Sequence, residues 1–174
     1  MKIAGLDNIK GVITDIDGVL TDGKIIIHND GTESKEFNVK DGQMVMWTRQ
    51  HLNLKFGAIS GRGGHAVEER LKALKFDYVA LSSDNKINSF RECLDKWNLK
   101  PNEILFIGDD FPDINVMRHA GVAVCPEDAN EFVHAFAGWR TKARGGKGVL
   151  QEILLEIARN RMGEENIMNV LIDA

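Results

Sequence analysis

Two short apolar runs, each followed at once by acidic residues, constrain the fold of this chain more than any other feature. The run GVIT at 11–14 precedes DIDGVLTDG at 15–23, and the run ILFI at 104–107 precedes GDDFPD at 108–113. Continuous apolar runs of this length are typical of strands buried on both faces, as in a parallel sheet. The carboxyl ends of such strands form the ligand-binding edge of open α/β sheets, so the acidic residues are expected to meet there.

The segments between and after these runs alternate between strand-like and helix-like patterns. Alternation of this kind predicts a parallel sheet with right-handed crossovers. We therefore expect an α/β fold, a Rossmann-like three-layer sandwich with a central parallel sheet between helices. The further expected strands are 55–59, 78–81 and 122–124, and the expected helices are 42–51, 64–74, 86–97, 114–119 and 149–161.

The segment at about 24–38 predicts a β-hairpin that forms a flap beside the sheet. An apolar run at 24–27 leads into the turn sequence NDG at 29–31, and partial alternation of apolar and polar residues follows it. Only this hairpin and one helix fit between Asp17 and Ser60, so no separate cap domain is expected. We expect one domain over residues 1–162 and a C-terminal tail over 163–174.

The tail carries Ile167, Val170 and Leu171 at helical spacing. These side chains can dock on a neighbouring subunit near its site, or the tail can simply fray.

The composition excludes several classes of protein. Of the 174 residues, 43% are hydrophobic and 28% are charged, and the net charge is −4 without a basic stripe, so no nucleic-acid partner is expected. The two cysteines and five scattered histidines suggest neither a disulfide framework nor a zinc site. Neither a signal peptide nor a run of membrane-spanning length is found, so we expect a cytoplasmic protein that does not bind membranes.

The acidic residues indicate metal-dependent phosphoryl transfer. Asp15 and Asp17 stand two residues apart after a strand, so they can share one face, with one carboxylate attacking phosphorus and the other handling a proton. Such aspartates can instead be simple turn or capping residues. The sequence GDDFPD places three more carboxylates at a second strand end, where Asp109 is a candidate metal ligand and Asp113 can cap the following helix. Clustered carboxylates repel unless a cation lies between them, and their hard oxygens suit Mg²⁺.

Two other candidates follow the remaining strands. Ser60, in the sequence SGR, ends a predicted strand in a hydroxyl that can donate a hydrogen bond to a phosphoryl oxygen. Lys86 opens the helix after the next strand, where its ammonium can offset negative charge. Taken alone, each has an ordinary explanation, Ser60 as a turn residue and Lys86 as a solvated lysine.

The order Asp-x-Asp, Ser, Lys and Gly-Asp-Asp-x-x-Asp resembles the haloacid dehalogenase superfamily of phosphatases over residues 10 to about 155. The resemblance implies that Asp15 is the nucleophile and Asp17 the general acid and base, with Ser60 and Lys86 binding phosphate. It also implies a Mg²⁺ ion held by the Asp15 carboxylate, the Asp17 carbonyl oxygen and Asp109.

Closer similarity is to the capless family of 3-deoxy-D-manno-octulosonate (KDO) 8-phosphate phosphatases. It is carried by DGVLTDG, by the pattern Gly31-x-Glu33-x-Lys35-x-Phe37, by NVKDG at 38–42, by SGR and by RGGKGV at 144–149. Members of this family are tetramers in which the hairpin and a neighbour's surface help form the site, so a homotetramer is implied. The implied substrate is a phosphorylated sugar acid, whose carboxylate an arginine can bind bidentately. The implied substrate contacts are Asp17, Asn38, Val39, Lys40, Asp41, Gly42, Arg62, Arg70, Lys86 and Asp110.

Three alternatives remain open at this stage. The nearest is a phosphatase for a nine-carbon sugar acid, either N-acylneuraminate 9-phosphate or KDN 9-phosphate. A non-catalytic interaction or regulatory module of the same fold is a second alternative. A signalling receiver domain is the third, but such domains place the lysine last, whereas Lys86 here precedes the GDD sequence at 108–110.

Overall fold

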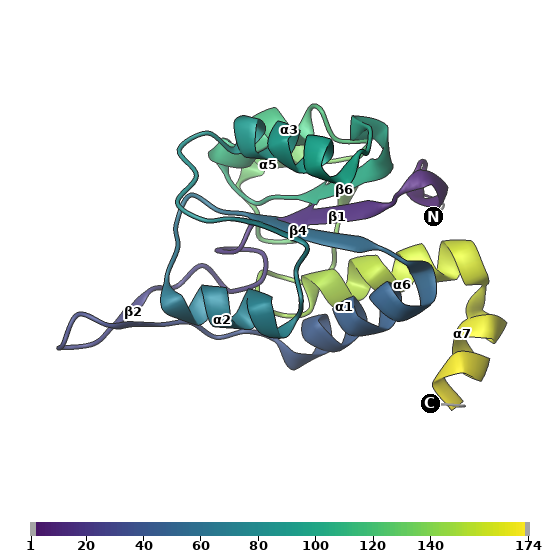
Figure 1. The fold of residues 1–174 in the computed structure, drawn as a ribbon, viewed down its shortest axis with the longest axis horizontal. Coiled ribbons are helices and arrows are strands. Elements are labelled where there is room, and N and C mark those ends of the chain that lie inside the picture. Colours follow the sequence, from purple (N-terminus) through teal and green to yellow (C-terminus); the bar gives the residue numbers. More distant parts are fainter. Residues whose placement is uncertain (1–2, 173–174) are drawn as a thin grey trace.

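The centre of the molecule is a six-stranded parallel sheet, as Figure 1 shows. The computed structural model describes residues 3–172. The strand order is β5-β4-β1-β6-β7-β8, and every neighbouring pair is parallel, so the predicted parallel sheet is confirmed. The strands are β1 (Gly11–Thr14), β4 (Lys55–Ile59), β5 (Tyr78–Ala80), β6 (Ile104–Ile107), β7 (Val122–Cys125) and β8 (Trp139–Arg140).

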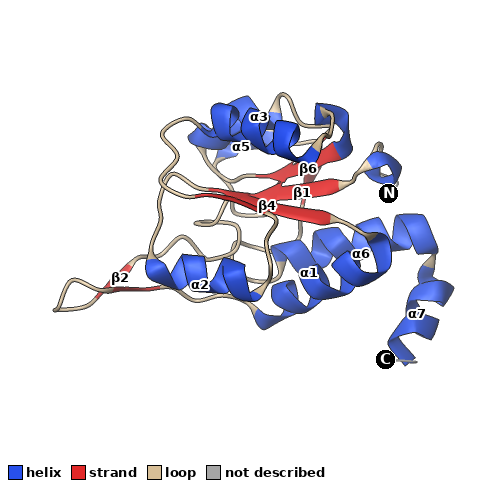
Figure 2. Ribbon diagram, viewed as in Figure 1, coloured by secondary structure: helices blue, strands red, loops and turns tan. Residues whose placement is uncertain are grey.

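Helices cover both faces of the sheet and complete three layers (Figure 2). On one face lie α1 (Val39–Leu52), α2 (His65–Ala73) and α6 (Val149–Met162). On the other face lie α3 (Lys86–Trp97), α4 (Ile114–Met117) and α5 (Glu131–His134). Short 3-10 turns occupy Leu6–Asn8, Pro101–Glu103 and Phe111–Asp113.

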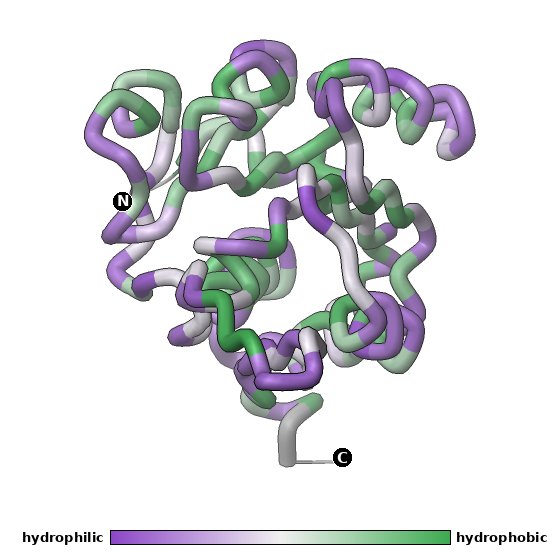
Figure 3. The backbone as a smooth tube through the Cα atoms, turned by 90° about the vertical axis from the view of Figure 1, so that its left-hand side faces the viewer, coloured by the Kyte–Doolittle hydropathy of each residue, from purple (hydrophilic) through white to green (hydrophobic). Residues whose placement is uncertain are grey.

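The hydrophobic core lies on both sides of the sheet because consecutive strand side chains point to opposite faces. Val12 packs against the layer of α1, α2 and α6, whereas Ile13 packs against the layer of α3, α4 and α5. Both side chains are buried. In Figure 3, hydrophobic segments cross the middle of the molecule between hydrophilic outer turns.

The structure differs most from the expected elements at the start of α1, at the end of α4 and in two short elements. Helix α1 begins at Val39 instead of residue 42, because the Asn38 side chain accepts a hydrogen bond from the Lys40 backbone N–H at 2.9 Å and caps the helix. The helix expected over 114–119 ends at Met117. Strand β8 and helix α5 were not predicted, since two and four residues are too few to show a periodic pattern.

The predicted hairpin is present and projects from the body of the molecule (Figure 1). Its strands are short, β2 (Ile26–Ile27) and β3 (Glu33–Ser34), and they pair antiparallel. Within residues 3–172 no further domain is inserted, which agrees with the expected absence of a cap.

The tail forms a second C-terminal helix, α7 (Glu164–Ile172), after Gly163. Ile167 is buried against its own chain, with 5% of its surface exposed. The side chain of Leu171 and the whole of residues 173–174 lie outside the described part of the structure, so the division at residue 162 and docking of the tail on a neighbour stay predictions. Among the described residues, no helix combines the length and apolar character needed to cross a bilayer.

Candidate active site

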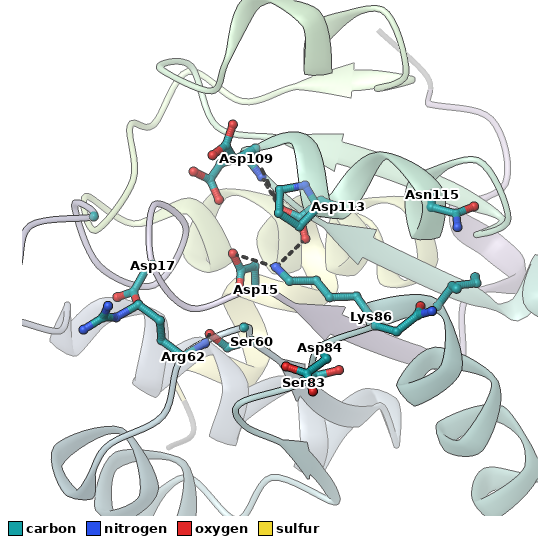
Figure 4. Close-up of a pocket in the computed structure, with 16 residues that line it drawn as sticks. Asp15, Asp17, Ser60, Arg62, Ser83, Asp84, Lys86, Asp109, Asp113 and Asn115 are labelled. Carbon is teal, nitrogen blue, oxygen red and sulfur yellow. Dashed lines mark hydrogen bonds and ion pairs between the residues drawn. The ribbon is translucent and has the colours of Figure 1, made fainter.

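Three strands bring the predicted site together at one edge of the sheet. Strand β1 lies between β4 and β6. The chain continues from β1 to β4 and β5 on one side and then crosses to β6 on the other side, and this reversal of strand order creates a ligand crevice in α/β folds. Asp15 follows β1, Ser60 follows β4, and Asp109 follows β6 after one glycine. These side chains line a cleft of about 550 Å³ (Figure 4). The other predicted residues that line it are Asp17, Arg62, Lys86 and Asp110.

Three carboxylates converge in this cleft, two of them buried and that of Asp109 half-buried. Asp15, Asp109 and Asp113 each offer an oxygen atom, and these atoms all lie within 4.8 Å of one another. The carboxylate of Asp113 accepts hydrogen bonds from the backbone N–H groups of Asp109 at 3.1 Å and Asp110 at 3.3 Å. The expectation that Asp113 caps the following helix is therefore wrong, because its side chain points back into the loop and makes no capping bond to α4.

Lys86 forms ion pairs with two of these carboxylates. Its ammonium lies 3.0 Å from Asp15 Oδ2 and 2.7 Å from Asp113 Oδ1, as the dashed lines of Figure 4 mark. Burial opposes the charge on Lys86, but the attraction of the two carboxylates outweighs burial, so the pKa of the ammonium is raised. The lysine therefore holds a fixed positive charge beside Asp15, and the explanation as a solvated lysine does not apply.

The acidic cluster carries more negative charge than Lys86 alone balances. Burial, followed by repulsion from Asp113, raises the pKa of Asp15 to about 6, although Lys86 opposes the change. Burial, followed by repulsion from Asp15 and Asp113, raises the pKa of Asp109 to about 8. A cation between Asp15 and Asp109 would stabilise both ionised forms.

Two observations make the cluster a good fit for a hard divalent ion. Asp15 Oδ1 and Asp109 Oδ1 are buried and have no hydrogen-bond partner among the described residues, whereas both oxygens of Asp113 already accept protein donors. Gly18 leaves room for this arrangement, since a Cβ atom there would lie 2.0 Å from Asp109 Oδ2. Asp15 and Asp109 are therefore the carboxylates free to bind a metal, and Asp113 positions Lys86 and the Asp109 loop around them.

The remaining residues of the cleft are placed to meet a phosphorylated ligand. Ser60 is buried, and its Oγ accepts a hydrogen bond from the Arg62 backbone N–H at 3.2 Å, so its hydroxyl proton is free to be donated. Arg62 forms an exposed ion pair with Glu33 of the hairpin at 3.0 Å. Asp110 accepts a hydrogen bond from the side chain of Asn130 at 3.2 Å.

The other implied substrate contacts do not reach this cleft within one chain. They surround the first turn of α1: Asn38, Val39, Lys40, Asp41, Gly42 and Arg70. Arg70 Nη2 donates to the Asn38 carbonyl oxygen at 3.1 Å and lies against Gly42, where a Cβ atom would be 2.6 Å from it. Val39 is 70% exposed. Their part in binding substrate stays a prediction.

Asp41 gives a prediction about stability. Burial raises the pKa of this carboxyl from 3.8 to about 6, so between these values the unfolded chain is ionised while the folded chain keeps its proton. Wild-type stability therefore falls over this range as pH rises. Asp41→Asn removes the titrating carboxyl and with it this pH dependence. The free energy of unfolding of the variant minus that of wild type should therefore rise by about 2 kcal/mol between pH 4.5 and 7.

Urea unfolding of both proteins at the two pH values measures this difference. Asp95→Asn makes the same chemical change at an exposed position of α3 and is the control, for which no comparable rise is expected. The same behaviour in Asp41→Asn would contradict the prediction.

The fold and the site define a haloacid dehalogenase-like hydrolase, and residues 78–153 match the family described by that name. The chain is 34% identical to the KDO 8-phosphate phosphatase of Escherichia coli K12 over 164 residues, which cover 93% of this chain and 87% of that protein. The chain therefore belongs to the KDO 8-phosphate phosphatase family and is a phosphoric monoester hydrolase.

Solved structures agree with this assignment. The KDO 8-phosphate phosphatase of Yersinia pestis superposes with a TM-score of 0.89 at 30% identity, covering 94% of this chain and 88% of that chain. The enzyme of the same name from Moraxella catarrhalis, in complex with magnesium, phosphate and KDO, gives a TM-score of 0.91 at 28% identity. That alignment covers 96% of this chain and 95% of the Moraxella chain.

Proposed function

We propose that this protein hydrolyses KDO 8-phosphate to KDO and phosphate in a Mg²⁺-dependent reaction through an aspartyl-phosphate intermediate. The observation that carries the proposal is the pair of unpartnered buried oxygens on Asp15 and Asp109, set beside the Lys86 ammonium in the cleft. The relatives at 34% identity act on KDO 8-phosphate, as their names state, and the Moraxella enzyme binds magnesium, phosphate and KDO. These names support the choice of sugar.

Each residue of the cleft has a separate role in the proposed reaction. Ser60 and Lys86 bind the phosphoryl group and hold it in line with Asp15, whose carboxylate attacks phosphorus. Asp17 gives its proton to the departing sugar oxygen and then takes one from the water that hydrolyses the aspartyl-phosphate. Asp15, Asp109 and the Asp17 carbonyl oxygen would hold Mg²⁺, which would neutralise charge on the phosphoryl oxygens.

A homotetramer would complete the sugar-binding part of the site. The cleft of a single chain is open, and the residues around the start of α1 do not line it. The hairpin exposes Ile25, Ile26 and Ile27 by 43%, 43% and 68%, which is apolar surface that a neighbouring subunit can cover. We therefore propose that the protein is a homotetramer located in the cytoplasm.

A comparison of two phosphorylated sugar acids tests the proposal. KDO 8-phosphate is expected to have a kcat/KM at least about tenfold above that of N-acylneuraminate 9-phosphate, with turnover in Mg²⁺ and none in excess EDTA. Released phosphate is the measurement. Preference for the nine-carbon substrate would overturn the choice of sugar, and full activity in EDTA would overturn the role of the metal.

A further inference from the structure

The lysine of the Gly31-x-Glu33-x-Lys35-x-Phe37 pattern has a buried ammonium paired with Asp17. The Lys35 side chain is 3% exposed, and its Nζ forms an ion pair with Asp17 Oδ1, whose side chain is 19% exposed. An ammonium is costly to bury unless a carboxylate and hydrogen bonds compensate it. Asp17 is the partner that keeps Lys35 in this position.

A second donor meets the same oxygen of Asp17. The hydroxyl of Thr21, a residue 1% exposed, lies 3.2 Å from Asp17 Oδ1. The Gly23 backbone N–H donates to that hydroxyl at 3.2 Å and holds it in place. Oδ1 therefore accepts two protein donors, whereas Oδ2 has no hydrogen-bond partner among residues 3–172. This leaves Oδ2 as the oxygen available to a ligand in the cleft.

The hairpin contributes two ion pairs to the cleft, Lys35 with Asp17 and Glu33 with Arg62. Glu33 and Lys35 stand two residues apart on the returning segment of the hairpin, a spacing that places two extended residues on the same face. Glu33 accepts a hydrogen bond from Arg62 at 3.0 Å, and Lys35 donates to Asp17. One short segment thus holds two cleft residues that belong to different loops of the sheet edge.

We propose that Lys35 is a positioning residue for the general acid: it binds Asp17 Oδ1 and so directs Oδ2 toward the leaving oxygen of the substrate. The inference rests on the proposed function, because it takes Asp17 as the proton donor. As the P–O bond breaks, its electron pair stays on the sugar oxygen, and the proton on Asp17 Oδ2 moves to that oxygen. Lys35 acts through Asp17 and is not itself a catalytic residue.

Leaving-group dependence tests this role. In Lys35→Met, kcat/KM for KDO 8-phosphate should fall at least about tenfold, because an alkoxide needs a correctly placed proton. For 4-nitrophenyl phosphate, whose phenolate leaves without a proton, kcat/KM should stay within about threefold of wild type. The parameter kcat/KM is the appropriate one, since it reports the steps up to release of the alcohol and not the later hydrolysis.

Two further variants make the result specific to the ammonium. Lys24→Met removes an exposed lysine that pairs with Asp22 at the start of the same segment, and it should leave both substrates unaffected. Lys35→Cys treated with 2-bromoethylamine restores an ammonium at nearly the same reach and should recover most of the lost activity on the sugar phosphate. The protein's own cysteines, Cys93 and Cys125, are both buried.

The outcomes separate this inference from the proposed function. Equal losses on both substrates, or no loss on either, would overturn the positioning role of Lys35. Wild-type turnover of KDO 8-phosphate decides the proposed function by itself. If the wild type prefers another alkyl phosphate, Lys35→Met is compared with wild type on that substrate and on 4-nitrophenyl phosphate. This comparison still decides the role of Lys35.

Discussion

Asp15→Asn is expected to lower phosphatase activity at least about a thousandfold, because the amide cannot form the aspartyl-phosphate. The fold should survive the change. Burial already raises the pKa of Asp15 to about 6, so at neutral pH the ionised carboxylate is unfavourable in the metal-free cleft. A neutral amide of the same shape removes repulsion from Asp109 and Asp113, and the thermal midpoint without Mg²⁺ should equal or exceed that of wild type.

Phosphate release and thermal unfolding in EDTA are the two measurements. Asp95→Asn makes the same chemical change on an exposed surface of α3 and should keep full activity. Turnover by Asp15→Asn at more than about a hundredth of the wild-type rate would exclude Asp15 as the nucleophile.

Lys86→Met is expected to have the largest effect on stability. The lysine is the shared partner of two buried carboxylates, at 3.0 Å from Asp15 and 2.7 Å from Asp113. Removing it leaves Asp113, which is fully buried, without its charged partner. The free energy of unfolding in EDTA should fall by about 3 kcal/mol, and activity should be lost because the phosphoryl group loses a cation.

Urea unfolding at pH 7.5 measures this effect, and a second lysine of the same helix serves as its control. Lys96 pairs with Glu92 across one exposed turn at 2.9 Å, so Lys96→Met should change the free energy of unfolding far less than Lys86→Met does. Equal losses in the two variants would mean that Lys86 does not compensate buried charge.

The sheet and the acidic centre of the site were predictable because each depends on local sequence. The run ILFI at 104–107 is buried at every position, and an unbroken apolar run followed by carboxylates indicates a strand end at a ligand-binding edge. The same reasoning correctly placed the ends of β1 and β4. Helix α3 has the expected bounds, from Lys86 to Trp97, because its apolar side chains repeat at helical spacing.

The role of Asp113 was not predictable from such patterns. An aspartate before a helix is an ordinary cap in sequence, but here the 3-10 turn at 111–113 directs its carboxylate toward Lys86. Gly108 permits this close packing, since a Cβ atom there would lie 2.3 Å from Asp113 Cβ. The third acidic residue of GDDFPD was the available signal, but the pattern predicted a helix cap instead of an ion pair with Lys86.

Contacts between segments that are distant in sequence were also not predictable. The pairing of Lys35 with Asp17 depends on the direction in which the hairpin leaves the sheet edge, which no periodicity in the sequence specifies. The segment at 38–42 was expected to form substrate contacts, yet within one chain it caps and begins α1. Its predicted contribution depends on how a neighbouring chain is placed, which is a property of an assembly and not of local sequence.

Binding of a metal ion between Asp15 and Asp109 depends on the pairing of β1 with β6. Asp15 and Asp109 are remote in sequence and become neighbours only when these two strands lie side by side. A nascent chain still lacking β6 therefore has no paired carboxylates with which to bind the ion. A divalent ion held by these two carboxylates would therefore bind the native topology selectively, and its concentration would set how strongly the finished fold is favoured over partly assembled ones.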